Sequence, residues 1–185
     1  MTYLHTFTIV AALLISTKVA VAQNVLIDKK GVAHFFSEAP LEDIEATNEK
    51  AIGAIDLDKG TVAVSMFIKN FHFEKSLMEE HFNENYLESE KYPKATFKGK
   101  IVDFSSYDFS KPGVITAKAN GELEIHGVKR PIVSDVTFEI SENTIGANTF
   151  FKVALEDHKI KIPKLVIKNI AEVVDVDVSF NFIKK

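Results

Sequence analysis

The 185-residue chain contains no cysteine. It can therefore form no disulfide, carry no lipid on an N-terminal cysteine and offer no thiolate nucleophile. Its 22 Lys and Arg are scattered among 26 Asp and Glu, so the sequence has no basic face of the kind that follows a phosphate backbone. These absences exclude a disulfide scaffold and argue against a nucleic-acid partner.

Signatures of catalysis are also missing. The sequence has no G-x-S-x-G elbow, no phosphate-binding glycine loop and no H-E-x-x-H pair. Five histidines follow residue 22, and none has a second close ligand in such a spacing: His34, His72, His81, His126 and His158. The acidic cluster around His81 is typical of a solvated helix face. We therefore predict no enzymatic activity, no cofactor and no metal site.

No apolar run reaches the ~20 residues that a membrane-spanning helix needs. The N-terminus instead has a short apolar stretch, Phe7 to Ile15, and then small residues that include Ala20 and Ala22 before Gln23. This layout predicts a cleavable secretory signal over residues 1–22 and one mature domain over residues 23–185. We expect an exported protein, periplasmic or secreted, with no membrane span after signal removal.

Alternation of apolar and polar residues dominates the rest of the chain. Over residues 174–182 every second residue is Val or Phe, and those between are Asp, Ser or Asn. Residues 115–125 follow the same period of two, which is typical of a strand with one buried face. Further strands are predicted at residues 32–37, 44–47, 52–57, 61–68, 96–104, 132–140 and 149–155.

One helix is expected, from Glu74 to Glu90. Its apolar residues recur at spacings of three and four, and Pro93 blocks any continuation. Just before it, Phe71 and Phe73 fall out of phase with the preceding strand, which predicts a bulge or bend. Eight or nine strands joined by short turns predict an all-β domain, either an antiparallel barrel or a sandwich.

Small residues on inward-facing positions decide whether such a barrel is hollow. Gly99, Ala117, Ala119 and Gly121 leave a void at their heights unless a neighbouring Phe crosses into it. A void would suit a hydrocarbon chain, at about 0.8 kcal/mol for each buried methylene. Plain packing of small residues against large ones is the alternative, and by the same reasoning Phe82 and Tyr86 either line a pocket mouth or fill an ordinary core.

Two blocks carry a resemblance to a known family. "HFNENYLESEKYPKATFKGKI" (residues 81–101) and "ANGELEIHGVKRPI" (residues 119–132) resemble the paired signature of the YceI-like family of exported lipid-binding or polyisoprenoid-binding proteins. The resemblance implies an antiparallel, lipocalin-like β-barrel of about eight strands with one short helix, an amphiphilic lipid ligand and no catalytic residue. The segments "GVAHFFSEAPLEDIEA" and "LEDHKIKIPKL" depart from the family pattern, which leaves pocket length and head-group contacts open.

The favoured hypothesis is an exported protein that holds an isoprenoid, quinone-like or other amphiphilic lipid in the barrel. The alternative is a filled barrel that acts as a structural or stress-response module through protein partners, and an enzyme is the third hypothesis. The candidate ligand-binding residues are Met66, Ile68, Phe71, Phe73, Phe82, Tyr86, Phe97, Ile101, Ala117, Ala119, Leu123, Ile125, Phe138 and Phe180.

Overall fold

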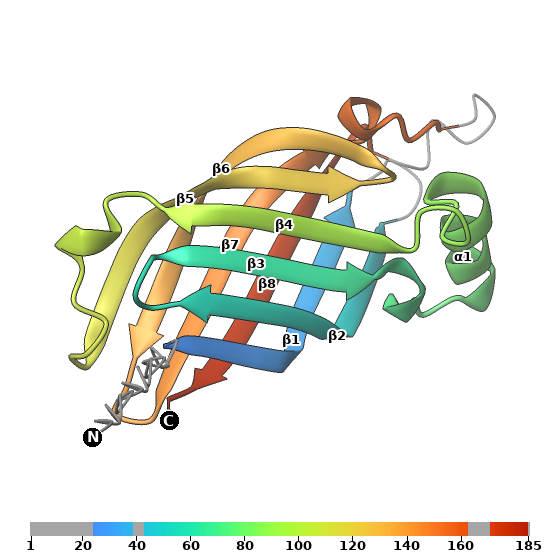
Figure 1. The fold of residues 1–185 in the computed structure, drawn as a ribbon. Helices are drawn as coiled ribbons and strands as arrows, with labels where there is room; N and C mark the ends of the chain where they lie inside the picture. The colour runs from blue at the N-terminus through green and yellow to red at the C-terminus, as the bar shows by residue number, and fades with distance from the viewer. Residues whose placement is uncertain (1–23, 39–42, 163–170, 185) are drawn as a thin grey trace, which may run out of the picture.

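Eight antiparallel strands, each paired with the next, form one closed barrel in which β1 also pairs with β8 (Figure 1). The computed structural model describes residues 24–38, 43–162 and 171–184; the expected signal and Gln23 lie outside them. Because β1 pairs with β8, the sheet is a closed barrel and not a sandwich. The strands are β1 Val25–Ser37, β2 Ile44–Asp56, β3 Thr61–Phe67, β4 Lys94–Ile101, β5 Gly113–Ile125, β6 Val128–Ile140, β7 Thr144–Ala154 and β8 Val173–Ile183.

Short helical turns occupy the connections. Helix α1 (Ser76–His81) runs into a π-helical turn, η2 (Phe82–Tyr86), and the two lie at the barrel end where β3 stops and β4 starts (Figure 1). The 3-10 turns are η1 Ile68–Asn70, η3 Phe104–Ser106 and η4 Leu155–His158. Turn η1 is the bend that the phase change before Phe71 predicted.

The helix is shorter than the sequence predicts. It begins at Ser76 because Lys75 is still extended, and the turn η2 ends at Tyr86. Glu88 then takes a left-handed conformation with φ 43°, which no α-helix continues. The chain thus leaves the helix before Pro93, the residue that we expected to limit it.

Strand β2 corrects another expectation, because residues 44–47 and 52–57 belong to one strand. The sequence predicts no strand over residues 48–51 between them. Instead Asn48 is buried, and its side-chain amide donates to the Phe67 carbonyl at 2.9 Å. The pairing of β2 with β1 shifts register on both sides of Gly31, so this stretch is a bulge inside a continuous strand.

One end of the barrel is filled with side chains. Phe138 is 2% exposed, and its ring lies 5.1 Å from that of Phe109, which stacks on Phe104 of η3. Ile55 and Ile145 in the same cluster are fully buried. This end, beside the β4–β5 connection, is an ordinary hydrophobic core, so any large cavity must lie toward the α1–η2 end.

Aromatic rings also cover glycines inside the barrel. A Cβ added to Gly99 or to Gly121 would lie 2.6 or 2.7 Å from the Phe97 ring, and one added to Gly31 or Gly53 would meet the Phe180 ring. Because these glycines have no side chain, the Phe97 and Phe180 rings can pack directly against the backbone. The void that Gly99 and Gly121 predicted is occupied by Phe97.

The conformation of Gly127 predicts that a side chain at this position destabilises the barrel. It has φ 69° in the tight turn between β5 and β6, and a Cβ there would lie 2.7 Å from the Tyr92 ring. Replacing Gly127 with valine should therefore lower the free energy of unfolding by roughly 1 kcal/mol or more. Urea denaturation measures the change, and a midpoint equal to the wild type would contradict it.

Candidate functional site

A cavity of about 270 Å³ lies at the end of the barrel near α1 and η2. We call it the main cavity. Its walls are apolar: Ala33 and Phe35 of β1, Leu123 and Ile125 of β5 and Val178 of β8 all contribute. The volume is close to the lower limit of about 300 Å³ for typical small-molecule pockets, so the main cavity is large enough for a slender apolar group.

The α1–η2 segment (Ser76–Tyr86) covers this cavity and is held by aromatic rings. Phe82 stacks on Phe35 with centroids 5.5 Å apart, and its ring lies 5.7 Å from Phe71 and 5.0 Å from Phe73. Such ring pairs add about 0.5–1.5 kcal/mol each to the burial of their area. These four phenylalanines and Tyr86 line the cavity, so Phe82 and Tyr86 lie at its boundary.

A second cavity of about 120 Å³ lies deeper, between the main cavity and the filled end. The two cavities share five apolar wall residues and are therefore adjacent: Met66, Ala95, Leu123, Phe151 and Val178. Met and Leu side chains change rotamer at low cost. A long apolar chain in the main cavity would therefore extend toward the second one.

The structure sorts the 14 candidate residues by depth. Eight line the main cavity: Met66, Ile68, Phe71, Phe73, Phe82, Tyr86, Leu123 and Ile125. Five more line only the second cavity: Phe97, Ile101, Ala119, Phe138 and Phe180. Ala117 lines neither cavity, because it packs into the filled end. The sequence reasoning missed lining residues on β1, β7 and β8 whose inward phase was readable, among them Phe35, Phe151, Val153 and Val176.

Polar groups around the main cavity are few. Among the lining residues, Tyr86, His81 and Ser37 contribute the side-chain oxygen and nitrogen atoms. Ser37 is 2% exposed, and its hydroxyl accepts a hydrogen bond from the Ala171 amide at 2.9 Å. Burial raises the pKa of the Tyr86 phenol, so this group remains a neutral donor at neutral pH. These polar side chains would orient one end of an otherwise apolar ligand.

A buried histidine joins the two signature blocks. His126 contacts the Glu88 carboxylate through Nε2 at 2.8 Å and the His158 carbonyl through Nδ1 at 3.1 Å. His158 in turn contacts the Val128 carbonyl at 3.1 Å. These contacts fix the end of η2, the β5–β6 turn and η4 to one another. These contacts give His126 a structural role.

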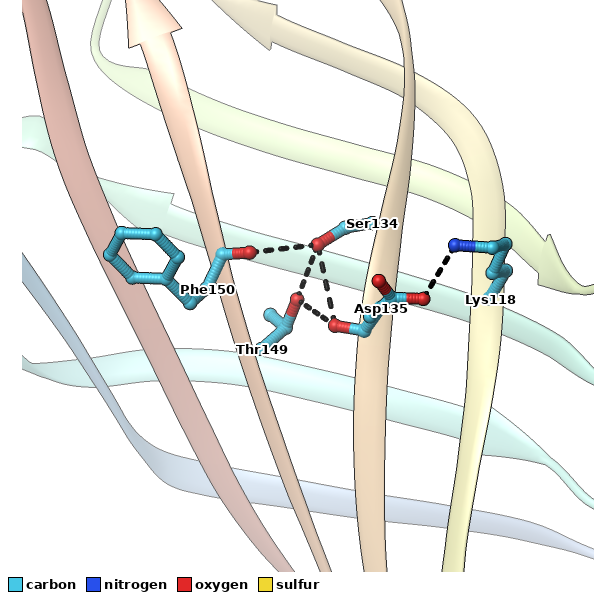
Figure 2. Close-up of polar contacts among 5 residues, drawn as sticks. All are labelled: Lys118, Ser134, Asp135, Thr149 and Phe150. Atoms are coloured by element: carbon cyan, nitrogen blue, oxygen red, sulfur yellow. Dashed lines mark hydrogen bonds and ion pairs between the residues drawn. The ribbon is translucent and has the colours of Figure 1, made fainter.

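Strands β6 and β7 separate near the middle of the barrel wall. Their pairing runs only from Val136↔Thr149 to Ile140↔Ile145. Figure 2 shows the side-chain contacts that join the two strands where their backbone pairing ends. The Ser134 and Thr149 hydroxyls lie 2.7 Å apart. Ser134 donates a hydrogen bond to the Phe150 carbonyl, and Thr149 donates one to the Asp135 carbonyl. Side-chain hydrogen bonds take the place of backbone hydrogen bonds between β6 and β7 here. Ser134 and Thr149 also line the second cavity.

Across the described ranges, no group of three or more His, Asp or Glu side chains is placed to hold a metal ion. The expectation of no metal stays a prediction. Within residues 24–38, 43–162 and 171–184 no helix has the length and apolar character needed to cross a membrane.

Comparisons with known proteins agree with this fold. A family model described as a YceI-like domain matches residues 26–182. No curated protein matches the sequence. The structure is similar to a polyisoprenoid binding domain from Saccharophagus degradans, with TM-score 0.75 and 12% identity over 89% of this chain and 100% of that one.

Two further solved structures share the architecture. BcnA of Burkholderia cenocepacia gives TM-score 0.68 and 15% identity over 84% of this chain and 97% of that one. A Campylobacter jejuni YceI protein gives TM-score 0.56 and 16% identity over 98% of this chain and 99% of that one. At these identities the structural likenesses show the fold alone.

Proposed function

The chain belongs to the YceI-like family, and from this membership we propose that it binds an amphiphilic lipid, such as an isoprenoid, in the main cavity and performs no catalysis. The observation that carries the proposal is the apolar main cavity of about 270 Å³ beneath the ring of Phe82. The structural neighbour from Saccharophagus degradans, itself called a polyisoprenoid binding domain, supports the same ligand class.

The energetics of burial favour a hydrocarbon ligand. Each methylene moved from water into such a cavity contributes about 0.8 kcal/mol, so ten methylenes contribute about 8 kcal/mol before the cost of association is subtracted. The few polar groups near the cavity, Tyr86 and His81 among them, would orient one polar end of the ligand.

Organic extraction of the purified protein, followed by mass spectrometry, tests this function. We expect one lipid class in roughly stoichiometric amount, together with its loss in a Phe82→Ala variant, because that ring lines the cavity and packs on Phe35 and Phe73. A Phe150→Ala variant, changed at a ring that is 52% exposed and lines neither cavity, is the control. An empty extract from the wild type, with no uptake of added lipid, would favour the filled barrel that acts through protein partners.

Export belongs to the same proposal. We infer that residues 1–22 direct the protein out of the cytoplasm, to the periplasm or beyond, because Ala20 and Ala22 precede Gln23 in the layout of a cleavage site. Intact-mass measurement on protein recovered from the exported fraction should give a chain that starts at Gln23. A start at Met1 in that fraction would contradict export through a cleaved signal.

A further inference from the structure

The side wall of the barrel lacks backbone pairing over part of the boundary between β6 and β7. Their pairing ends at Val136↔Thr149. Beyond this point, among the described strands, residues 128–135 of β6 pair only with β5 and residues 150–154 of β7 pair only with β8. We call the space between these two half-strands the β6–β7 fork. A paired sheet resists lateral opening because its backbone hydrogen bonds must break together, and the fork lacks that resistance.

Turn η4 bridges the wide end of the fork. The Arg130 guanidinium of β6 donates to the Asp157 carbonyl at 2.8 Å, and the His158 ring contacts the Val128 carbonyl of β6 at 3.1 Å. Strand β7 leads directly into η4. The fork is therefore a bounded window in the barrel wall, closed by η4 at one end and by the paired part of β6 and β7 at the other.

The inner side of the fork faces the second cavity. Ile132 and Ser134 of β6 line that cavity, as do Thr149 and Phe151 of β7. Ile132 and Phe151 also pack against the buried cluster that contains Leu123. Apolar side chains thus close the window from within. Such side chains move by changing rotamer, which leaves the paired strands intact.

Two hydroxyl groups hold the fork together at its narrow end. In Figure 2 the Ser134 and Thr149 side chains point toward each other in the space between the strands, and their oxygens lie 2.7 Å apart. Each hydroxyl also donates to a carbonyl of the opposite strand, Ser134 to Phe150 at 3.2 Å and Thr149 to Asp135 at 2.8 Å. Side-chain contacts of this kind break and re-form one at a time, so they hold the two strands together reversibly.

The outer rim of the fork is apolar. Val133 of β6 is 57% exposed and Phe150 of β7 is 52% exposed, one on each side of the fork. On the neighbouring strand β5, by contrast, the exposed positions from Thr116 to Glu122 are all polar. Apolar side chains therefore border the fork both outside and inside, as the passage of a hydrocarbon tail requires.

We propose that the β6–β7 fork is a side portal through which the hydrocarbon tail of the ligand passes between the outside and the second cavity. The inference rests on the proposed lipid-binding function and adds the route of entry and release. The competing route is the end of the barrel beside the α1–η2 segment.

A disulfide across the fork tests the route, because the chain has no cysteine of its own. The double variant Ser134→Cys/Thr149→Cys replaces two hydroxyls that lie 2.7 Å apart, so its thiols are within reach of a bond. Stopped-flow fluorescence on delipidated protein follows the uptake of parinaric acid, a slender fluorescent fatty acid, and a chase with excess stearic acid follows its release. Oxidation should slow uptake and release by one common factor of about ten or more relative to the reduced form, because a blocked path raises the same barrier in both directions.

Two further variants control this test. Thr137→Cys/Asn148→Cys joins β6 and β7 at a paired position that lines neither cavity, and its oxidation should leave both rates unchanged. Ser134→Ala/Thr149→Val removes the two hydroxyls and keeps the side chains close to their original shape. It should take up and release the probe about threefold faster than the wild type or more, and it tests the portal without any cross-link.

Three results would overturn the portal. Equal rates in the oxidised and reduced forms, with the disulfide verified by intact mass, would assign entry to the α1–η2 end and leave lipid binding intact. Slower uptake with unchanged release would mean that the cross-link weakens binding itself and does not block a path. A wild type that takes up no parinaric acid and yields no lipid on extraction would reject lipid binding and the portal together.

Discussion

Replacing Phe138 with alanine should lower the free energy of unfolding by about 3 to 5 kcal/mol. The ring is 2% exposed and lies edge-on to Phe109 at 5.1 Å, in the largest cluster of buried residues. Removing it leaves a void that the paired strands β5, β6 and β7 cannot collapse to fill, so the lost transfer energy and the cavity cost add.

Urea denaturation gives this change directly, provided that the slope of the transition stays constant. Val114→Ala is the control at the same end of the barrel, because Val114 is 70% exposed, and surface substitutions usually change stability by less than about 0.5 kcal/mol. A loss below about 1 kcal/mol for Phe138→Ala would mean that the filled end of the barrel contributes little to stability.

The strands and their buried faces were predictable from the sequence, because a strand with one buried face repeats every two residues whatever its partners are. Val174, Val178 and Phe182 of β8 are buried as the alternation predicts, while Asp177 is exposed. Alternation fixes which face of a strand is inside. It does not fix register, and so it did not distinguish a barrel from a sandwich.

The failures occurred where a local pattern was overridden by distant contacts. The predicted strand ended at Thr47, yet the next residue, Asn48, lies within β2, and its side-chain amide donates to the Phe67 carbonyl of another strand. The helix ended early because Glu88 is held in a left-handed conformation while its carboxylate contacts His126, 38 residues away. Neither partner is identifiable from sequence spacing.

The sequence predicted which face of each strand points into the barrel, but not how far along the barrel each residue of the candidate site lies. Ala117 and Ala119 share one face of β5, yet the first packs into the filled end and the second lines a cavity. The difference depends on where Phe109 and Phe138 place their rings, which is decided by tertiary packing. The aromatic cluster around Phe82 likewise needs Phe35 from β1, more than 40 residues earlier in the sequence.

Three alanine-to-phenylalanine variants test this difference in depth, and they carry the largest expected effect on the ligand. Ala33 is 1% exposed and lines the main cavity, so Ala33→Phe should place a ring in the space that we propose for the lipid and reduce extractable lipid by about tenfold or more. Each displaced methylene removes about 0.8 kcal/mol of burial, and two suffice for such a change.

The other two variants probe the deeper positions. Ala119→Phe fills the second cavity, so it should reduce the binding of long-tailed lipids and leave short-tailed ones bound in the main cavity. Ala117→Phe has no cavity to fill, and overpacking should cost ~1 to 3 kcal/mol of stability with little change in bound lipid. Extraction with mass spectrometry and urea midpoints are measured on all three. If Ala33→Phe unfolds more easily while its lipid content equals that of the wild type, the ligand does not lie in the main cavity.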